Sequence, residues 1–206
     1  MDTSKANRDL KVIRELMERP IRYSTMSGLS GILAGCAALA GLAADLYCWS
    51  NLAPKRALVA NMFVWGGVFV AALTATSILT RFRERKQGMP FWSPIKRRIL
   101  LTILPPFVAA IGLTFAIVYR YMHTGGLDSV WQGYLIPAVW MLFYGVALWQ
   151  LGAFSPVEVR VLGATFIAAG LVTAAFGQWY PYWAMGVTFG GFHIIYGIIV
   201  WIRHGG

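Results

Sequence analysis

Long apolar runs alternate along this chain with short segments that hold most of its charged residues. Each run is long enough for an α-helix to cross a bilayer, which takes about 20 residues at about 1.5 Å rise per residue. The pattern predicts six spans, at about residues 23–47, 57–80, 94–119, 131–152, 156–178 and 182–202. We therefore expect an all-α, polytopic membrane protein with six transmembrane helices.

An N-terminal segment, residues 1–22, precedes the first predicted span. At helical spacing, apolar side chains fall on one face of a helix over residues 4–19, and basic side chains cover much of the remaining surface. Pro20 is expected to end this cytoplasmic amphipathic helix. Such a helix either lies among anionic headgroups or docks on the protein's own cytoplasmic face, and the sequence supports both equally.

The positive charges are strongly biased to one side of the six-span pattern. The chain has 18 Lys and Arg residues against eight acidic residues, for a formal net charge of +10. Lys55, Arg56 and Arg120 fall on one side, and the remaining 15 fall on the other. Because Lys and Arg collect in cytoplasmic loops, both termini are predicted to be cytoplasmic. Basic residues confined to connectors between apolar runs also argue against direct binding of nucleic acid.

The connector between the second and third spans is the most basic segment. Residues 81–98 contain one acid, Glu84, and seven basic residues: Arg81, Arg83, Arg85, Lys86, Lys96, Arg97 and Arg98. We expect these seven to form a cytoplasmic basic face that contacts anionic inner-leaflet lipid or an acidic protein surface. The alternative is that these basic residues only keep the loop on the cytoplasmic side of the membrane, which would by itself account for the charges.

Small residues recur every four positions at the start of the first span, at Ser27, Gly31 and Gly35. A stripe of this kind lets another helix approach backbone to backbone, which is how helices associate in lipid. We expect helix packing along the stripe, and a protein partner or an oligomer contact through span 1.

Two other features lie within the predicted spans. Asp45, near the outer end of the first span, is expected to pair with Lys55 or Arg56 across a short turn. Pro105 and Pro106 leave backbone carbonyls of the third span without partners and are expected to kink that helix.

A short sequence pattern occurs twice. Residues 144–149 and residues 196–201 both read Tyr-Gly-x-x-x-Trp, and both lie at the inner end of a span. Aromatic residues gather at membrane interfaces, so two matching interfacial anchors account for the pattern. The match is too short to establish a duplicated fold.

His193 is the one histidine within a predicted span. A buried imidazole needs a partner, so His193 either makes a hydrogen bond between helices or contacts a ligand. The candidate residues for a ligand site or a polar network are His193, Tyr196, Tyr144 and Trp140. A pocket for an apolar ligand would add Trp65, Phe143 and Phe189 to these four.

The residue types needed for catalysis do not converge in the sequence. Metal and haem sites need several ligands close together, and the three histidines are widely separated. We expect no metal, no cofactor and no catalytic residue. Residues 28–31, Gly-Leu-Ser-Gly, resemble the Gly-x-Ser-Gly element of rhomboid proteases. Because Ser30 lies on the first span instead of the fourth, an intramembrane hydrolase using Ser30 and His193 is a disfavoured alternative.

Three parts of the chain carry a wider resemblance: residues 13–19 running into 27–31, residues 154–163, and residues 192–197. Together they resemble a family of small bacterial six-span inner-membrane proteins of unknown function, often encoded beside a winged-helix transcriptional regulator. The resemblance implies a bacterial inner membrane and a regulatory protein partner, and it transfers no catalytic residue.

These patterns predict a non-enzymatic membrane protein that acts as a sensor, scaffold or regulatory partner. One alternative is a binder or carrier of a lipid or other apolar ligand within the helix bundle. Another is an accessory subunit of a larger membrane complex.

Overall fold

The computed structural model describes residues 27–86, 88, 90–124, 135–176 and 181–204, so the predicted amphipathic helix in residues 1–22 lies outside it. The described residues form helices and turns and no strand, which confirms the all-α class. The helices are α2 (Gly28–Asn51), α3 (Pro54–Lys86), α4 (Pro94–Thr124), α6 (Leu135–Leu151), α7 (Val157–Phe176), α8 (Pro181–Met185), the π-helix η2 (Gly186–Phe192) and α9 (His193–His204).

Five helical segments are long and apolar enough to cross a membrane. They are α2, α3, α4, α7 and the continuous run Pro181–Arg203, which contains α8, η2 and most of α9. Helix α6 is also apolar but has 17 residues, fewer than the about 20 of a straight crossing. The chain therefore has the helices of a multi-pass membrane protein. The length of α6 alone does not establish that this helix crosses the membrane.

Two helices extend past the predicted spans. Helix α3 continues to Lys86 instead of residue 80, because Lys and Arg are good helix formers and are favourable in a helix's last turn. Helix α4 reaches Thr124 and passes through Pro105 and Pro106 as one helix. The third span is therefore one helix through both prolines, and the kink expected there stays a prediction.

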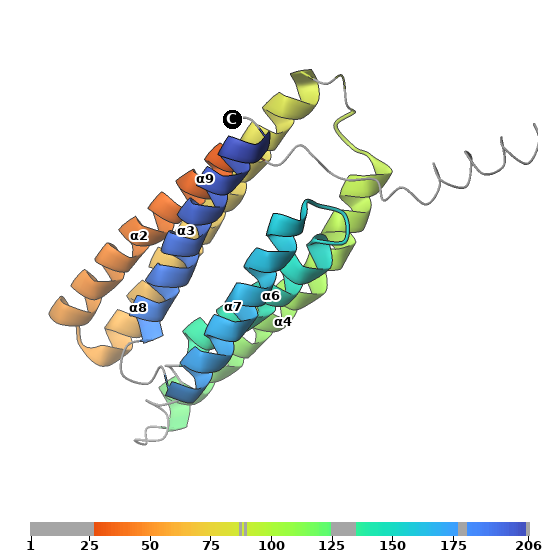
Figure 1. Cartoon of the computed structure of the whole chain (residues 1–206). Helices are drawn as coiled ribbons and strands as arrows, with labels where there is room; N and C mark the ends of the chain where they lie inside the picture. Colours follow the sequence, from red (N-terminus) through yellow and green to blue (C-terminus); the bar gives the residue numbers. More distant parts are fainter. Residues whose placement is uncertain (1–26, 87, 89, 125–134, 177–180, 205–206) are drawn as a thin grey trace, which may run out of the picture.

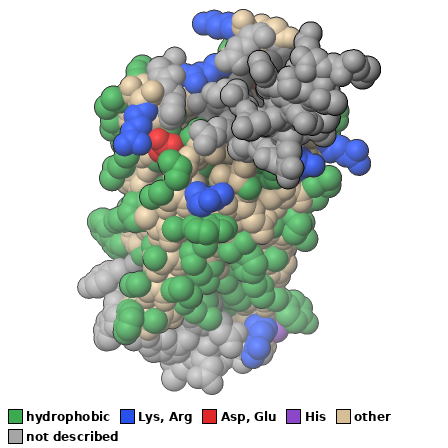
Figure 2. Space-filling view, turned by 45° about the vertical axis from the view of Figure 1, so that its right-hand side comes forward, with side chains coloured by type: hydrophobic (Ala, Val, Ile, Leu, Met, Phe, Trp, Pro, Cys, Tyr) green, Lys and Arg blue, Asp and Glu red, His purple; other side chains and the backbone are tan. Residues whose placement is uncertain are grey.

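The helices form two groups (Figure 1). Helix α2 packs against α3, η2 and α9, and α6 packs against α4 and α7. Aromatic contacts join the groups, since the rings of Phe69 on α3 and Phe107 on α4 have centroids 5.4 Å apart. Figure 2 shows a broad apolar surface across the middle of the molecule, with most of the basic side chains toward one end. We call this the basic end; α3 ends there and α4 begins there.

Glycine residues let α2 and α9 touch through their backbones. A Cβ atom on Gly197 would lie 2.6 Å from the carbonyl oxygen of Gly28 and 2.7 Å from the nitrogen of Ile32. Both neighbours are backbone atoms, so neither can move aside without separating the helices. This contact therefore depends on glycine at position 197.

The predicted small-residue stripe lies in this same contact. Ser27 is buried, and a Cβ on Gly31 would lie 3.1 Å from the Cα of Gly197. A Cβ on Gly35 would lie 2.6 Å from the carbonyl oxygen of Gly190. The stripe thus packs against the last span of its own chain. This face is not open to a foreign helix, and an oligomer contact through another face of α2 stays a prediction.

Helices α6 and α7 meet through a second contact of the same kind. A Cβ on Gly145 would lie 2.8 Å from both the carbonyl oxygen of Gly163 and the nitrogen of Ile167. A Cβ on Gly163 would lie 2.6 Å from the nitrogen of Trp149, just as a Cβ on Gly28 lies 2.6 Å from the nitrogen of Trp201. The two helix pairs therefore repeat one packing arrangement.

The sequence of the partner helices repeats as well. Residues 28–35 read GLSGILAG, and residues 163–170 read GATFIAAG. The Ser30 hydroxyl donates to the Ser27 carbonyl at 2.6 Å, and the Thr165 hydroxyl donates to the Leu162 carbonyl at 2.8 Å. The Tyr-Gly-x-x-x-Trp pattern is thus one half of an internal repeat of a helix pair. Interfacial anchoring alone is too narrow an explanation for it.

Candidate functional site

The structure joins two of the predicted polar-network residues, Tyr144 and His193. The Tyr144 hydroxyl lies 2.6 Å from Nε2 of His193, and His193 is 7% exposed. The other ring nitrogen, Nδ1, is buried beside the carbonyls of Thr188 and Phe189, without a well-formed hydrogen bond to any described residue. Because carbonyls only accept, we assign the ring hydrogen to Nδ1, so Nε2 accepts from Tyr144. This bond links α6 to α9 and so links the two helix groups.

Aromatic rings surround the Tyr144–His193 pair. The Tyr144 ring lies 4.9 Å from that of Phe166 and 5.1 Å from that of Phe189, between centroids. Phe166 is fully buried and lies 5.4 Å from the His193 ring. Sequence reasoning missed Phe166, because one phenylalanine on an apolar helix looks like any other core residue. These rings pack around His193, and an apolar pocket there stays a prediction.

Trp140 and Tyr196 lie close to this cluster but make other contacts. The Trp140 indole donates to the Thr114 hydroxyl of α4 at 3.0 Å, and its ring lies 6.3 Å from that of Phe107. Tyr196 packs against the buried core between α6 and α7. The four predicted residues therefore share one region, with the Tyr144–His193 bond at its centre.

The segment before His193 is a π-helix, which the sequence did not predict. Turns of this type are wider than those of an α-helix and occur frequently at functional sites. The side of η2 next to α2 carries Gly190, where a Cβ would lie 2.5 Å from Cδ2 of Leu39. The π-helix ends where α9 begins, at His193.

A second buried polar pair links α2 to α3. The Asn61 amide donates to Oδ1 of Asp45, and these residues are only 4% and 0% exposed. The predicted pairing of Asp45 with Lys55 or Arg56 is wrong, because both basic residues lie exposed in the first turn of α3. Asp45 lies beside the Trp49 side chain, but its Oδ2 makes no well-formed hydrogen bond to any residue that the structure describes.

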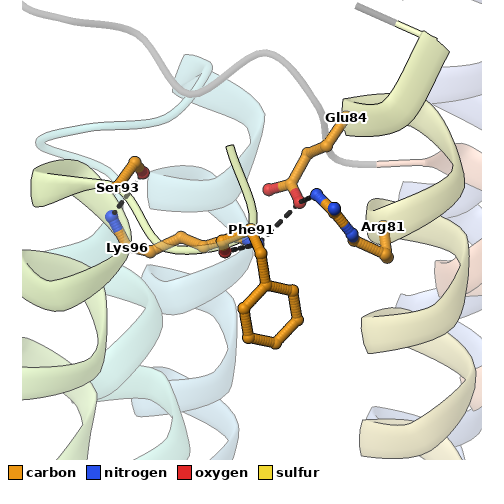
Figure 3. A network of polar contacts seen from close by, with 5 residues as sticks. All are labelled: Arg81, Glu84, Phe91, Ser93 and Lys96. Carbon is orange, nitrogen blue, oxygen red and sulfur yellow. Dashed lines mark hydrogen bonds and ion pairs between the residues drawn. The ribbon is translucent and has the colours of Figure 1, made fainter. Parts of the chain in front are cut away.

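A clamp at the basic end holds the start of α4 against the end of α3 (Figure 3). The Glu84 side chain is 1% exposed, and its Oε2 accepts from Nζ of Lys96 at 2.6 Å and lies 3.6 Å from the Arg81 guanidinium. Lys96 also donates to the Phe91 carbonyl at 2.9 Å. Its backbone N–H donates to the Ser93 hydroxyl at 3.3 Å, as at a helix N-cap. We call Glu84, Lys96, Arg81 and Phe91 the Glu84 clamp.

The clamp divides the predicted basic face. Arg81 and Lys96 are half-buried, and their cationic groups lie 5.2 Å and 5.3 Å from the centroid of the Phe91 ring. Arg83 is also half-buried. The exposed members are Arg85, Lys86, Arg97 and Arg98. These four are the ones available to a partner or a lipid.

The residues of the hydrolase alternative have separate partners. The Ser30 hydroxyl donates to the carbonyl of Ser27, whereas Nε2 of His193 is bonded to Tyr144. Within the described ranges, no three His, Cys, Asp or Glu side chains come together as they would around a metal ion.

Tyr144→Phe is expected to lower the free energy of unfolding by about 1 kcal/mol, because it leaves the buried Nε2 of His193 without a donor. The measurement is unfolding of the purified protein in detergent. Tyr47→Phe is the matched control, since Tyr47 is 70% exposed. In a double-mutant cycle with His193→Phe, which removes the acceptor, strictly additive effects would show that the bond contributes nothing.

The resemblance to small bacterial six-span proteins stays an expectation from the sequence. No model of a known protein family, no curated protein and no solved structure matches this chain.

Proposed function

We propose that this protein is a non-enzymatic membrane scaffold, sensor or regulatory partner that binds an acidic protein surface through its basic end. The main support is the Glu84 clamp, whose central carboxylate is buried and bonded to Lys96 at 2.6 Å. The clamp ties the end of α3 to the start of α4, and the exposed Arg85 and Lys86 lie in the last turn of α3. Charges held in place lose less conformational entropy on binding than charges on a loose loop.

The proposal includes an orientation. It places six spans in a bacterial cytoplasmic membrane, with α6 as the fourth and both termini in the cytoplasm. The charge bias along the chain supports this orientation. So does the ion pair between Arg203 and Glu158, at 3.0 Å, which puts the end of α9 beside the start of α7. The last span then ends on the same side as the connector between α6 and α7.

The test compares two variants that each lose two exposed positive charges. In Arg85→Gln/Lys86→Gln the loss is at the basic end, and in Lys55→Gln/Arg56→Gln it is at the opposite end of α3. Tagged proteins are purified from native membranes, and bound proteins are quantified by mass spectrometry. We expect a partner that wild type and the second variant recover equally, and that the first variant recovers about threefold to tenfold less.

Equal recovery of every bound protein by all three forms would contradict the proposal. So would the absence of any specifically bound protein with an acidic surface segment.

A further inference from the structure

A groove beside the first turns of α4 combines positive charge with apolar surface. Its volume is about 540 Å³, and its lining includes Trp92, Ser93, Arg97, Arg98 and Leu101. None of the lining residues is acidic. The preceding carboxylate in the sequence, Glu84, is buried and bonded to Lys96, so it does not neutralise the two arginines.

The apolar wall of this groove continues along α4. Leu101, Leu104, Val108 and Ile111 follow Arg97 at spacings of three and four residues, so all five share one helix face. The four apolar side chains are 57%, 49%, 58% and 41% exposed. From Leu101 to Ile111 the helix rises about 15 Å, which is half of the about 30 Å hydrocarbon core of a bilayer. The stripe therefore spans about one leaflet.

We infer that this groove binds an anionic phospholipid, with its phosphate at Arg97 and Arg98 and one acyl chain along the stripe. The guanidinium groups suit a phosphate, because each presents several N–H donors in a fixed plane. Trp92 is 57% exposed beside them and has the amphipathic side chain that is enriched at membrane interfaces.

The combination of charge and stripe selects a lipid over other anions. A free phosphate would use the two arginines and leave Leu101 and the apolar residues beyond it uncovered. An acidic peptide would remain at the membrane surface, because burying its polar backbone in hydrocarbon is costly. A phospholipid joins both requirements in one molecule. The inference is independent of the proposed protein partner, which contacts Arg85 and Lys86.

The test is a lipid titration followed by native mass spectrometry of the detergent-purified protein. The probes are phosphatidylglycerol and phosphatidylcholine with identical acyl chains. Wild type should bind phosphatidylglycerol more tightly than phosphatidylcholine. In Arg97→Gln/Arg98→Gln the affinity for phosphatidylglycerol should fall about 25-fold, a factor of about five for each basic side chain. The affinity for phosphatidylcholine should fall less, because its choline group offsets the charge of the phosphate. Both residues are exposed, and the one ring contact of Arg98, 5.8 Å from the Phe154 centroid, contributes little at an exposed site, so the variant should unfold within a few degrees of wild type.

Lys55→Gln/Arg56→Gln has the same loss of charge away from the groove and should bind both lipids as wild type does. Equal weakening in the two variants would mean that net charge alone attracts lipid, and would overturn the inference. Two further arms test the source of the ligand. Displacement of phosphatidylglycerol by millimolar inorganic phosphate, or equal affinity for a six-carbon and an eighteen-carbon phosphatidylglycerol, would show that the stripe takes no part.

Discussion

Gly197→Leu should lower the free energy of unfolding by about 3 kcal/mol or more, the largest effect that we expect from any single substitution in this chain. The first atom of the new side chain would lie 2.6 Å from the Gly28 carbonyl oxygen and 2.7 Å from the Ile32 nitrogen. Both are helix backbone atoms, so α2 and α9 must move apart. Leucine is a better helix former than glycine by about 0.8 kcal/mol, so any loss arises from packing alone.

Thermal and denaturant unfolding in detergent measure this effect. Gly112→Leu is the matched control, because Gly112 is exposed on α4 and a Cβ there would have no neighbour within 4 Å. The internal repeat adds a second requirement: Gly145→Leu, at the corresponding position of α6, should destabilise the protein about as much as Gly197→Leu. If Gly197→Leu and Gly112→Leu have the same free energy of unfolding, α2 and α9 do not make this close backbone contact.

Lys96→Met should lower the free energy of unfolding by about 2–3 kcal/mol. It removes the 2.6 Å bond to Glu84, whose side chain is only 1% exposed, and the 2.9 Å bond to the Phe91 carbonyl. Loss of one partner from a buried ion pair typically costs about 3–5 kcal/mol, because the remaining charge is left in a poorly solvated place. Arg81 stays 3.6 Å from Glu84, so we expect a smaller loss here.

The control for the loss of charge is Lys86→Met, which removes an exposed lysine from the last turn of α3 and should change stability by less than about 0.5 kcal/mol. Glu84→Gln should cost less than Lys96→Met, because the amide oxygen still accepts from Lys96 and no uncompensated anion is buried. If Lys96→Met and Lys86→Met had equal free energies of unfolding in the same denaturant series, the Glu84 clamp would not stabilise the fold.

The fold class and parts of the site were predictable from the chain alone. An apolar run of about 20 residues carries its own signal, so the membrane helices could be recognised one by one. Ser27, Gly31 and Gly35 were recognised as packing residues because small side chains at regular spacing serve little else in lipid. Tyr144 and His193 both stood out because polar side chains within apolar spans need partners.

Other features depended on how the helices are rotated about their axes. Asp45 bonds to Asn61 instead of to the basic residues nearest in sequence, and Phe166 lies against His193. Neither contact leaves a local pattern, because each involves one residue on each of two separate helices. The π-helix before His193 was missed for a similar reason, since it packs against α2, a helix far away in the sequence.

By itself, the sequence determined which segments favour lipid and which favour water. The reason is that the free energy of transferring a side chain from water to hydrocarbon depends on that side chain alone. Only the tertiary structure decided which helices are neighbours. It set the glycine stripe of α2 against α9, and it showed that the Tyr-Gly-x-x-x-Trp segments make equivalent contacts with two different helices. Such choices depend on the fit of two surfaces, and in lipid that fit, rather than hydrophobicity, drives helix association.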